Sequence, residues 1–138
     1  MNKKIFTLIF ISLSIISYNQ SQNFSFESKF IEYAIFDQSI DDYASTGKEW
    51  QVIRVDIWDD YVQLTGNDED GNQEKRILWW EMNEEESSDN YVVYYTEKNI
   101  EKIVFNTLED EIYIFYEYNE KLNLFIELMI LSKITQIE

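Results

Sequence analysis

The stretch VDIWDDYVQLTGNDEDGNQEKRILWW, residues 55–80, holds three short runs of β-branched and aromatic residues separated by two acidic turns. Runs of this kind between polar turns are typical of antiparallel strands. We place the turns at Asp59–Asp60 and Asp70–Gly71, since Asp-Gly is a favoured pair for a two-residue hairpin turn. Directly opposed residues share a face of the sheet. Counting outward from both turns predicts one apolar face, made of Ile53, Val55, Ile57, Val62, Leu64, Ile77 and Trp79.

In this register Val55 lies opposite Leu64, which lies opposite Ile77, and Val62 lies opposite Trp79. A slip of one residue at either turn would move apolar side chains to the other face and mix them with polar ones. The agreement between two separately placed turns is therefore the strongest structural signal in the chain.

The same counting extends through the C-terminal half. A turn at Lys98–Asn99 sets Tyr94 opposite Ile103, and a turn at Glu109–Asp110 sets Ile103 opposite Tyr116. Strands are expected over residues 50–58, 61–66, 73–82, 91–97, 101–108, 111–118 and 122–131.

These elements predict an all-β or mostly β domain, an antiparallel meander of six to seven strands. A small barrel, a sandwich and a curved sheet all satisfy the pattern. Residues 122–131, LNLFIELMIL, fit either a strand or a buried helix, because they are apolar nearly throughout. Apolar residues at 26, 30, 31, 34 and 35 follow spacing that is nearer to a helix, so a helix in residues 24–36 is expected to pack on the sheet. Residues 44–49 are predicted to form a loop.

The N-terminus has the pattern of an export signal. Two lysines in MNKK precede the uncharged run IFTLIFISLSIIS, residues 5–17, and a polar segment follows. The run is shorter than the roughly 20 residues of a membrane-spanning helix. We predict a signal peptide over residues 1–21, cleaved before Gln22, and a single β-rich domain over residues 22–138. The protein is then periplasmic or secreted and has no membrane span after the signal is removed. The alternative is a buried N-terminal helix or strand.

The charge balance narrows the range of partners. The chain carries a net charge of −16, and removing the signal takes away Lys3 and Lys4 and so gives −18. Nucleic acid and anionic membranes are poor partners for such a surface, whereas a basic protein or a divalent cation is acceptable. The chain has no cysteine and no histidine, so the usual zinc ligands and the commonest general base are missing. No cofactor is expected beyond weakly bound calcium.

The acidic turn at residues 68–71 does not match an EF-hand calcium loop. With Gly71 at position 6, Asp68 and Asp70 fit positions 3 and 5. Positions 1 and 12 would then be Gly66 and Ile77, whose side chains cannot coordinate calcium. The stretch is therefore predicted to be a hairpin turn.

A candidate ligand-binding row lies on the reverse face of the first three strands. Aromatic rows can stack sugar rings or bases, and arginines can bind carboxylates. The alternative is that the N-terminal segment packs over this face and buries the row. The row comprises Trp58, Tyr61 and Trp80, with Arg54 and Arg76 toward its other end.

A second candidate site is an acidic end of the sheet. Successive hairpin loops of a meander alternate between its two ends, so three loops without a basic residue should share one end. We predict weak calcium binding or docking of a basic protein there, with oxygen ligands from several loops. The alternative is a solvated end that serves solubility. The residues are Asp59, Asp60, Glu84, Glu85, Glu86, Asp89, Glu109, Asp110 and Glu111.

The function expected is that of a non-catalytic binding or interaction module. The alternative function is that of a small secreted hydrolase that uses a carboxylate pair, as glycosidases do. A serine nucleophile would have only lysine as its base, and the three glycines form no phosphate-binding loop.

Four features of the sequence can be compared with known proteins: the lysine-led signal, Trp50 at the start of the sheet, the DEDGN hairpin, and the tyrosine-rich segments YVVYYT and EIYIFYEY. In these features it resembles small exported proteins of the Bacteroidetes type. The resemblance implies neither an activity nor a role for any residue.

Overall fold

The computed structural model describes residues 24–137, and these residues form a closed eight-stranded barrel. Each strand pairs antiparallel with the next one along the chain, and β8 pairs with β1 to complete the circle. The signal peptide predicted for residues 1–21 lies outside the described residues. The strands are β1 (Phe24–Asp37), β2 (Asp42–Ile57), β3 (Tyr61–Asn67), β4 (Gln73–Met82), β5 (Tyr91–Thr96), β6 (Lys102–Asn106), β7 (Glu111–Asn119) and β8 (Leu124–Ile137).

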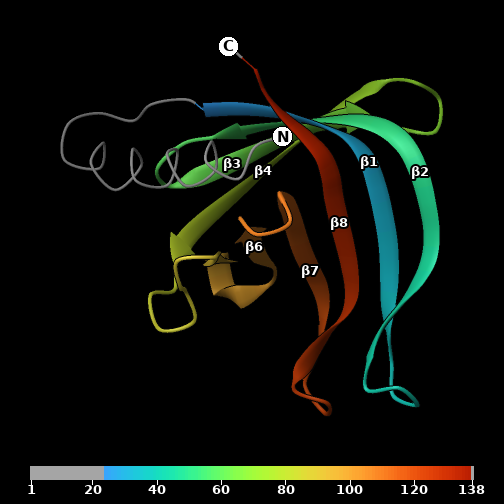
Figure 1. Cartoon of the computed structure of the whole chain (residues 1–138), viewed down its shortest axis with the longest axis vertical. Coiled ribbons are helices and arrows are strands. Elements are labelled where there is room, and N and C mark those ends of the chain that lie inside the picture. The colour runs from blue at the N-terminus through green and yellow to red at the C-terminus, as the bar shows by residue number, and fades with distance from the viewer. Residues whose placement is uncertain (1–23, 138) are drawn as a thin grey trace.

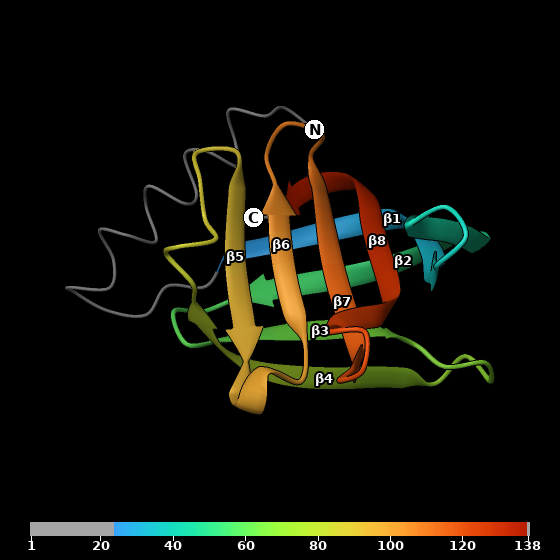
Figure 2. The same ribbon diagram turned by 90° about the horizontal axis from the view of Figure 1, so that it is seen from below.

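The barrel is flattened into two layers whose strands cross. Figure 1 shows β8, β1 and β2 as long, curved neighbours on one side. In Figure 2, β5, β6 and β7 lie in front of β1 to β4 and run across them. The pairing of β4 with β5 extends over only three residues of each strand, Trp80–Met82 and Tyr94–Thr96. Much of β4 therefore has a strand neighbour on one side alone, where the two layers diverge.

The predicted all-β antiparallel fold is confirmed, but the helix expected in residues 24–36 is wrong. These residues form β1, which pairs with β2 on one edge and β8 on the other. Its register shifts between Ser28 and Phe30 and again between Tyr33 and Ala34. A bulge adds a residue and breaks the period of two. The shifts therefore produce the helix-like spacing of apolar residues.

The strands β2 and β8 decide two further expectations. The loop predicted over residues 44–49 is wrong, because β2 already begins at Asp42. The apolar run of residues 122–131, which fitted either a helix or a strand, belongs to a strand from Leu124 onward, because β8 spans Leu124–Ile137. In the described part of the chain, the only helical segment is the short 3-10 turn η1 (Glu97–Asn99). Residues 24–137 thus contain no helix with the length and apolar character needed to cross a membrane.

The register predicted for the β2–β3 hairpin is confirmed, and the register predicted for the β3–β4 hairpin is wrong by one residue. Val55 pairs with Leu64 as predicted, but Leu64 pairs with Arg76 and not with Ile77. The β3–β4 loop spans residues 68–72. Asp68 organises this loop, because its carboxylate accepts hydrogen bonds from the backbone of Asp70 at 3.0 Å and Asn72 at 2.8 Å.

This shift exchanges the faces of β4. Leu78 and Trp80 face the core at 5% and 7% exposure, whereas Ile77 and Trp79 lie outside at 50% and 53%. The predicted apolar face is thus correct for β2 and β3 and wrong for Ile77 and Trp79.

Of the two later hairpins, the β5–β6 register is confirmed and the β6–β7 register is wrong. Tyr94 pairs with Ile103 as predicted, but Ile103 pairs with Ile114 and not with Tyr116. The error of two residues arises because the β6–β7 loop begins earlier than Glu109. Asn106 starts this loop by accepting hydrogen bonds from the backbone of Leu108 at 3.0 Å and Glu109 at 3.2 Å.

The inward side chains pack into one apolar core. An eight-stranded barrel has an interior just wide enough for its own side chains to fill. At the centre, Trp80 stacks on Tyr94 with ring centroids 4.1 Å apart and meets the edge of Phe105 at 5.8 Å. The core cluster comprises Phe26, Ile31, Val55, Ile57, Val62, Leu78, Trp80, Val92, Tyr94, Ile103, Phe105, Ile112, Ile114, Leu131 and Ile134.

Candidate functional site

The predicted aromatic row exists on the outer surface with one member replaced. Trp58 stacks on Tyr61 with centroids 4.6 Å apart, and Tyr61 contacts Trp79 at 4.8 Å. Trp80, the third predicted member, lies in the core, where its indole Nε1 donates to the Asp59 carbonyl at 3.1 Å. The one-residue shift between β3 and β4 is the cause.

Both arginines predicted for ligand binding have acidic partners within the chain. Arg54 Nε lies 3.0 Å from Asp56 Oδ1, and the buried Asp56 also accepts the Ser25 hydroxyl at 2.5 Å. Arg76 forms an ion pair with the buried Glu101. Both arginines therefore neutralise buried carboxylates of the barrel.

The three acidic loops leave one end of the barrel, as the alternation of hairpins predicts. The β4–β5 loop, however, folds back along β5: Asn83 N donates to Val93 O at 2.8 Å, and Val93 N donates to Ser87 Oγ at 2.9 Å. Glu86 thereby reaches Lys102 Nζ at 3.1 Å. The three loops contain no basic residue, as the sequence shows, but the fold brings Lys102 of β6 against Glu86.

The remaining acidic residues of the three loops do not form one cluster, although two of the loops contact each other. The β6–β7 loop joins the β4–β5 loop where Thr107 N donates to Asn90 O at 2.9 Å. Burial raises the pKa of the Glu111 carboxyl above its usual range, and the charges of Glu109 and Glu32 raise it further. Among residues 24–137, no three carboxylate side chains come close enough together to hold a metal ion.

A groove that the sequence did not predict lies on the outer face of β5, β6 and β7. We call it the aromatic groove. Its volume is about 810 Å³. It is lined by five rings (Tyr43, Tyr95, Phe115, Tyr118, Phe125), three amides (Asn83, Asn99, Asn123), four charged residues (Glu86, Lys98, Lys102, Glu120) and Leu124.

The pairing of three strands builds the floor of this groove. Lys102 on β6 lies opposite Tyr95 on β5 and opposite Phe115 on β7. Its ammonium lies 5.7 Å from the centroids of both rings, which is cation–π range. The three side chains point outward because they alternate with the inward Tyr94, Ile103 and Ile114.

Glu86 completes a polar contact over this floor. Burial raises the pKa of the Tyr95 hydroxyl, and its hydrogen bond to Glu86 raises that pKa further. The same hydrogen bond, together with Lys102, lowers the pKa of the Glu86 carboxyl despite partial burial. At neutral pH the groove thus holds a charged pair, Glu86 and Lys102, beside a neutral phenol.

The β1–β2 and β7–β8 hairpins supply the walls. The Tyr43 hydroxyl donates to the Phe125 carbonyl at 2.6 Å, and its ring meets the edge of Phe115 at 5.6 Å. Tyr118 forms a hydrogen bond with Asn123 and meets the edge of Phe125 at 5.2 Å. Four of the five rings are therefore linked to one another by direct contacts.

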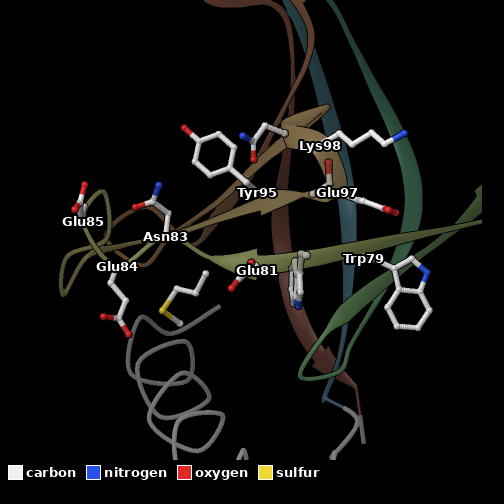
Figure 3. A pocket seen from close by; sticks show the side chains of 12 residues that line it. Trp79, Glu81, Asn83, Glu84, Glu85, Tyr95, Glu97 and Lys98 are labelled. Atoms are coloured by element: carbon white, nitrogen blue, oxygen red, sulfur yellow. The ribbon is translucent and has the colours of Figure 1, made fainter.

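A second hollow, which we call the acidic groove, continues from the first. It measures about 660 Å³ and runs between β4 with its loop and β5 with η1 (Figure 3). Asn83, Tyr95, Lys98 and Asn99 line both grooves. Its charged residues are Glu81, Glu84, Glu85, Glu97 and Lys98. Trp79 lines its far side and connects it to the outer aromatic row.

A third, smaller hollow of about 420 Å³ lies over the partly buried Ile53, Leu64 and Met129. Arg76 lines it, and the partner of Arg76, Glu101, also accepts the Thr96 hydroxyl at 2.6 Å. Arg76 is thus already paired within the barrel.

Sequence reasoning missed the aromatic groove for two reasons. The predicted register already placed Lys102 opposite Tyr95, but the error of two residues at the β6–β7 turn moved Phe115 away from Lys102. The fold of residues 83–90 along β5 has no signal in the spacing of residues. An outward Tyr95–Lys102–Phe115 row is the signal that a correct register would have given.

Comparison of the chain with protein-family models, with curated proteins and with solved structures finds no match.

Proposed function

We propose that the protein is a non-catalytic binding module that holds its ligand in the aromatic groove. The observation that carries the proposal is the groove itself, which five rings line and in which a lysine lies over two of them. Ligand sites are concave and largely apolar, with a few placed polar groups. The packed core supports a site on the outer surface of the barrel.

The buried carboxylates support binding over hydrolysis. A carboxylate-pair hydrolase needs two acids that flank a cleft, one of them held protonated. The buried Asp56 and Glu101 each form an ion pair with an arginine, so neither is an unpaired acid facing a cleft. Glu86 in the aromatic groove is held charged.

The place of action proposed is outside the cytoplasm. The lysine-led start and the apolar run of residues 5–17 support export. A site made of rings, amides and ion pairs needs neither a thiol nor a metal, so it suits either the periplasm or the medium.

A thermal-shift screen tests this function. Oligosaccharides, amino acids, short peptides and fatty acids are each added to the protein, to Tyr118→Ala and to Tyr91→Ala. A ligand at one hundred times its Kd stabilises the native state by about 2.7 kcal/mol. At least one class should raise the Tm of the protein and of Tyr91→Ala. Tyr118→Ala should lose about half of the shift, since Tyr118 lines the groove and Tyr91 does not, and a tenfold weaker Kd leaves about 1.4 kcal/mol of stabilisation.

The two tyrosines are matched in exposure, at 46% for Tyr118 and 40% for Tyr91. A Tm that no class raises, or a shift that persists in full in Tyr118→Ala, would contradict the proposal.

A further inference from the structure

We propose that the ligand of the aromatic groove is a neutral oligosaccharide. This inference rests on the proposed function, since it names the chemistry that the same groove recognises. Three features of the groove support it: the kind of side chain on its walls, its charge balance, and its continuation toward Trp79.

The walls present ring faces and edges beside groups that both donate and accept hydrogen bonds. A sugar ring offers an apolar face of C–H groups and a rim of hydroxyls. The exposed ring of Tyr118 suits the first, because an aromatic ring is a flat apolar surface with a negative face. The amides of Asn83, Asn99 and Asn123 suit the second, because each can donate and accept.

Charge balance favours an uncharged ligand. Two lysines and two glutamates line the aromatic groove, and Glu86 and Lys102 already neutralise each other at 3.1 Å. This neutrality is local, because the whole chain has a net charge of −16. The adjoining acidic groove has four glutamates against one lysine, so it repels an anionic sugar chain.

The path of the surface favours a chain of several sugars. The aromatic and acidic grooves meet at Tyr95, Lys98 and Asn99. Beyond them Trp79 continues into the stacked Tyr61 and Trp58. A compact ligand would fill one groove, whereas an oligosaccharide can follow both and reach this aromatic row.

Isothermal titration calorimetry on the full chain tests the inference. The probes are neutral hexasaccharides of glucose, of mannose, of xylose and of N-acetylglucosamine, together with hexagalacturonate as the anionic counterpart. At least one neutral hexamer should bind. Hexagalacturonate should bind at least about tenfold more weakly, because its carboxylates face the acidic groove.

Variants then assign the site. Tyr118→Ala should weaken binding by about tenfold, the scale of one lost aromatic contact. Tyr118→Phe keeps the ring and should stay within about threefold of the protein, as should Tyr91→Ala, which removes a tyrosine outside the groove. The Tm of each variant, measured without ligand, shows that it is folded.

The outcomes separate the ligand from the site. If no neutral hexamer binds, or hexagalacturonate binds as tightly as they do, the saccharide inference is overturned. The proposed function then still stands if another class gives a thermal shift that is reduced in Tyr118→Ala and kept in Tyr91→Ala. If a neutral hexamer binds the protein and Tyr118→Ala equally, the assignment of the groove is overturned.

Discussion

Trp80→Ala is expected to lower the free energy of unfolding by about 3–5 kcal/mol, the usual cost of removing a large aromatic side chain from a core. The side chain is buried, stacks on Tyr94 and meets the edge of Phe105. Its indole also donates to the Asp59 carbonyl, which ties the β2–β3 turn to the core. Urea unfolding followed by circular dichroism measures the loss.

The neighbouring tryptophan provides the control. Trp79→Ala removes the same side chain from the outer face, where it packs on Tyr61, and should cost less than about 1.5 kcal/mol. The register counted from an Asp70–Gly71 turn would have reversed the two results. Equal costs, or a greater cost at Trp79, would contradict the β3–β4 pairing described above.

A loss of stability at alkaline pH is the second large effect expected. Burial raises the pKa of Tyr94 from 10.0 to about 12, and the charge of Asp59 adds to the shift. The native state thus retains a proton that the unfolded chain loses above pH 10. This contribution to stability is complete below pH 10 and is lost as pH rises toward 12. Two pKa units correspond to about 3 kcal/mol, of which about 1.4 kcal/mol is lost by pH 11.

Tyr94→Phe has no hydroxyl to ionise, so its stability should fall less steeply between pH 9 and pH 11. The slope is compared with that of the protein and of Tyr91→Phe, which alters an exposed tyrosine. Urea unfolding at each pH gives the slopes. Parallel slopes for the protein and Tyr94→Phe would show that Tyr94 ionises as freely when folded as when unfolded.

The sequence was most informative where a turn leaves a single register. At Asp59–Asp60 the backbone of Trp58 donates to the Tyr61 carbonyl across the turn, and the predicted pairing of Val55 with Leu64 is confirmed. The turn predicted at Asp70–Gly71 gave the wrong register, because the carboxylate of Asp68, and not the Asp-Gly pair, organises a five-residue loop. Side chains that hydrogen-bond to nearby backbone compete with simple turn rules.

β1 shows a second limit of sequence reasoning. Phe26 and Ile31 both face the core although they are five positions apart in the sequence. A regular strand would place them on opposite faces, and only the register shift after Ser28 reconciles the two. Because a bulge leaves no fixed mark in the sequence, the helix-like spacing could not be told from a helix.

The candidate site was harder to predict from the sequence than the fold was, because it depends on contacts that folded loops create. Alternation along β5 and β6 makes Tyr95 and Lys102 outward neighbours, and this could be counted. The return of Glu86 along β5 and the contact of Tyr43 with Phe125 could not, since both join segments through folded loops. The predicted Trp58–Tyr61 pair was correct, and its true third member, Trp79, leads toward the groove.

With the interior of the barrel packed, the proposed ligand site lies outside, in the aromatic groove. Backbone amide chemical shifts of ¹⁵N-labelled protein, recorded with and without the neutral hexasaccharides, test this placement. The largest changes are expected on Tyr95, Lys102 and Tyr118. Changes that instead concentrate on inward residues such as Ile103 and Ile114, with the groove unmoved, would contradict this placement.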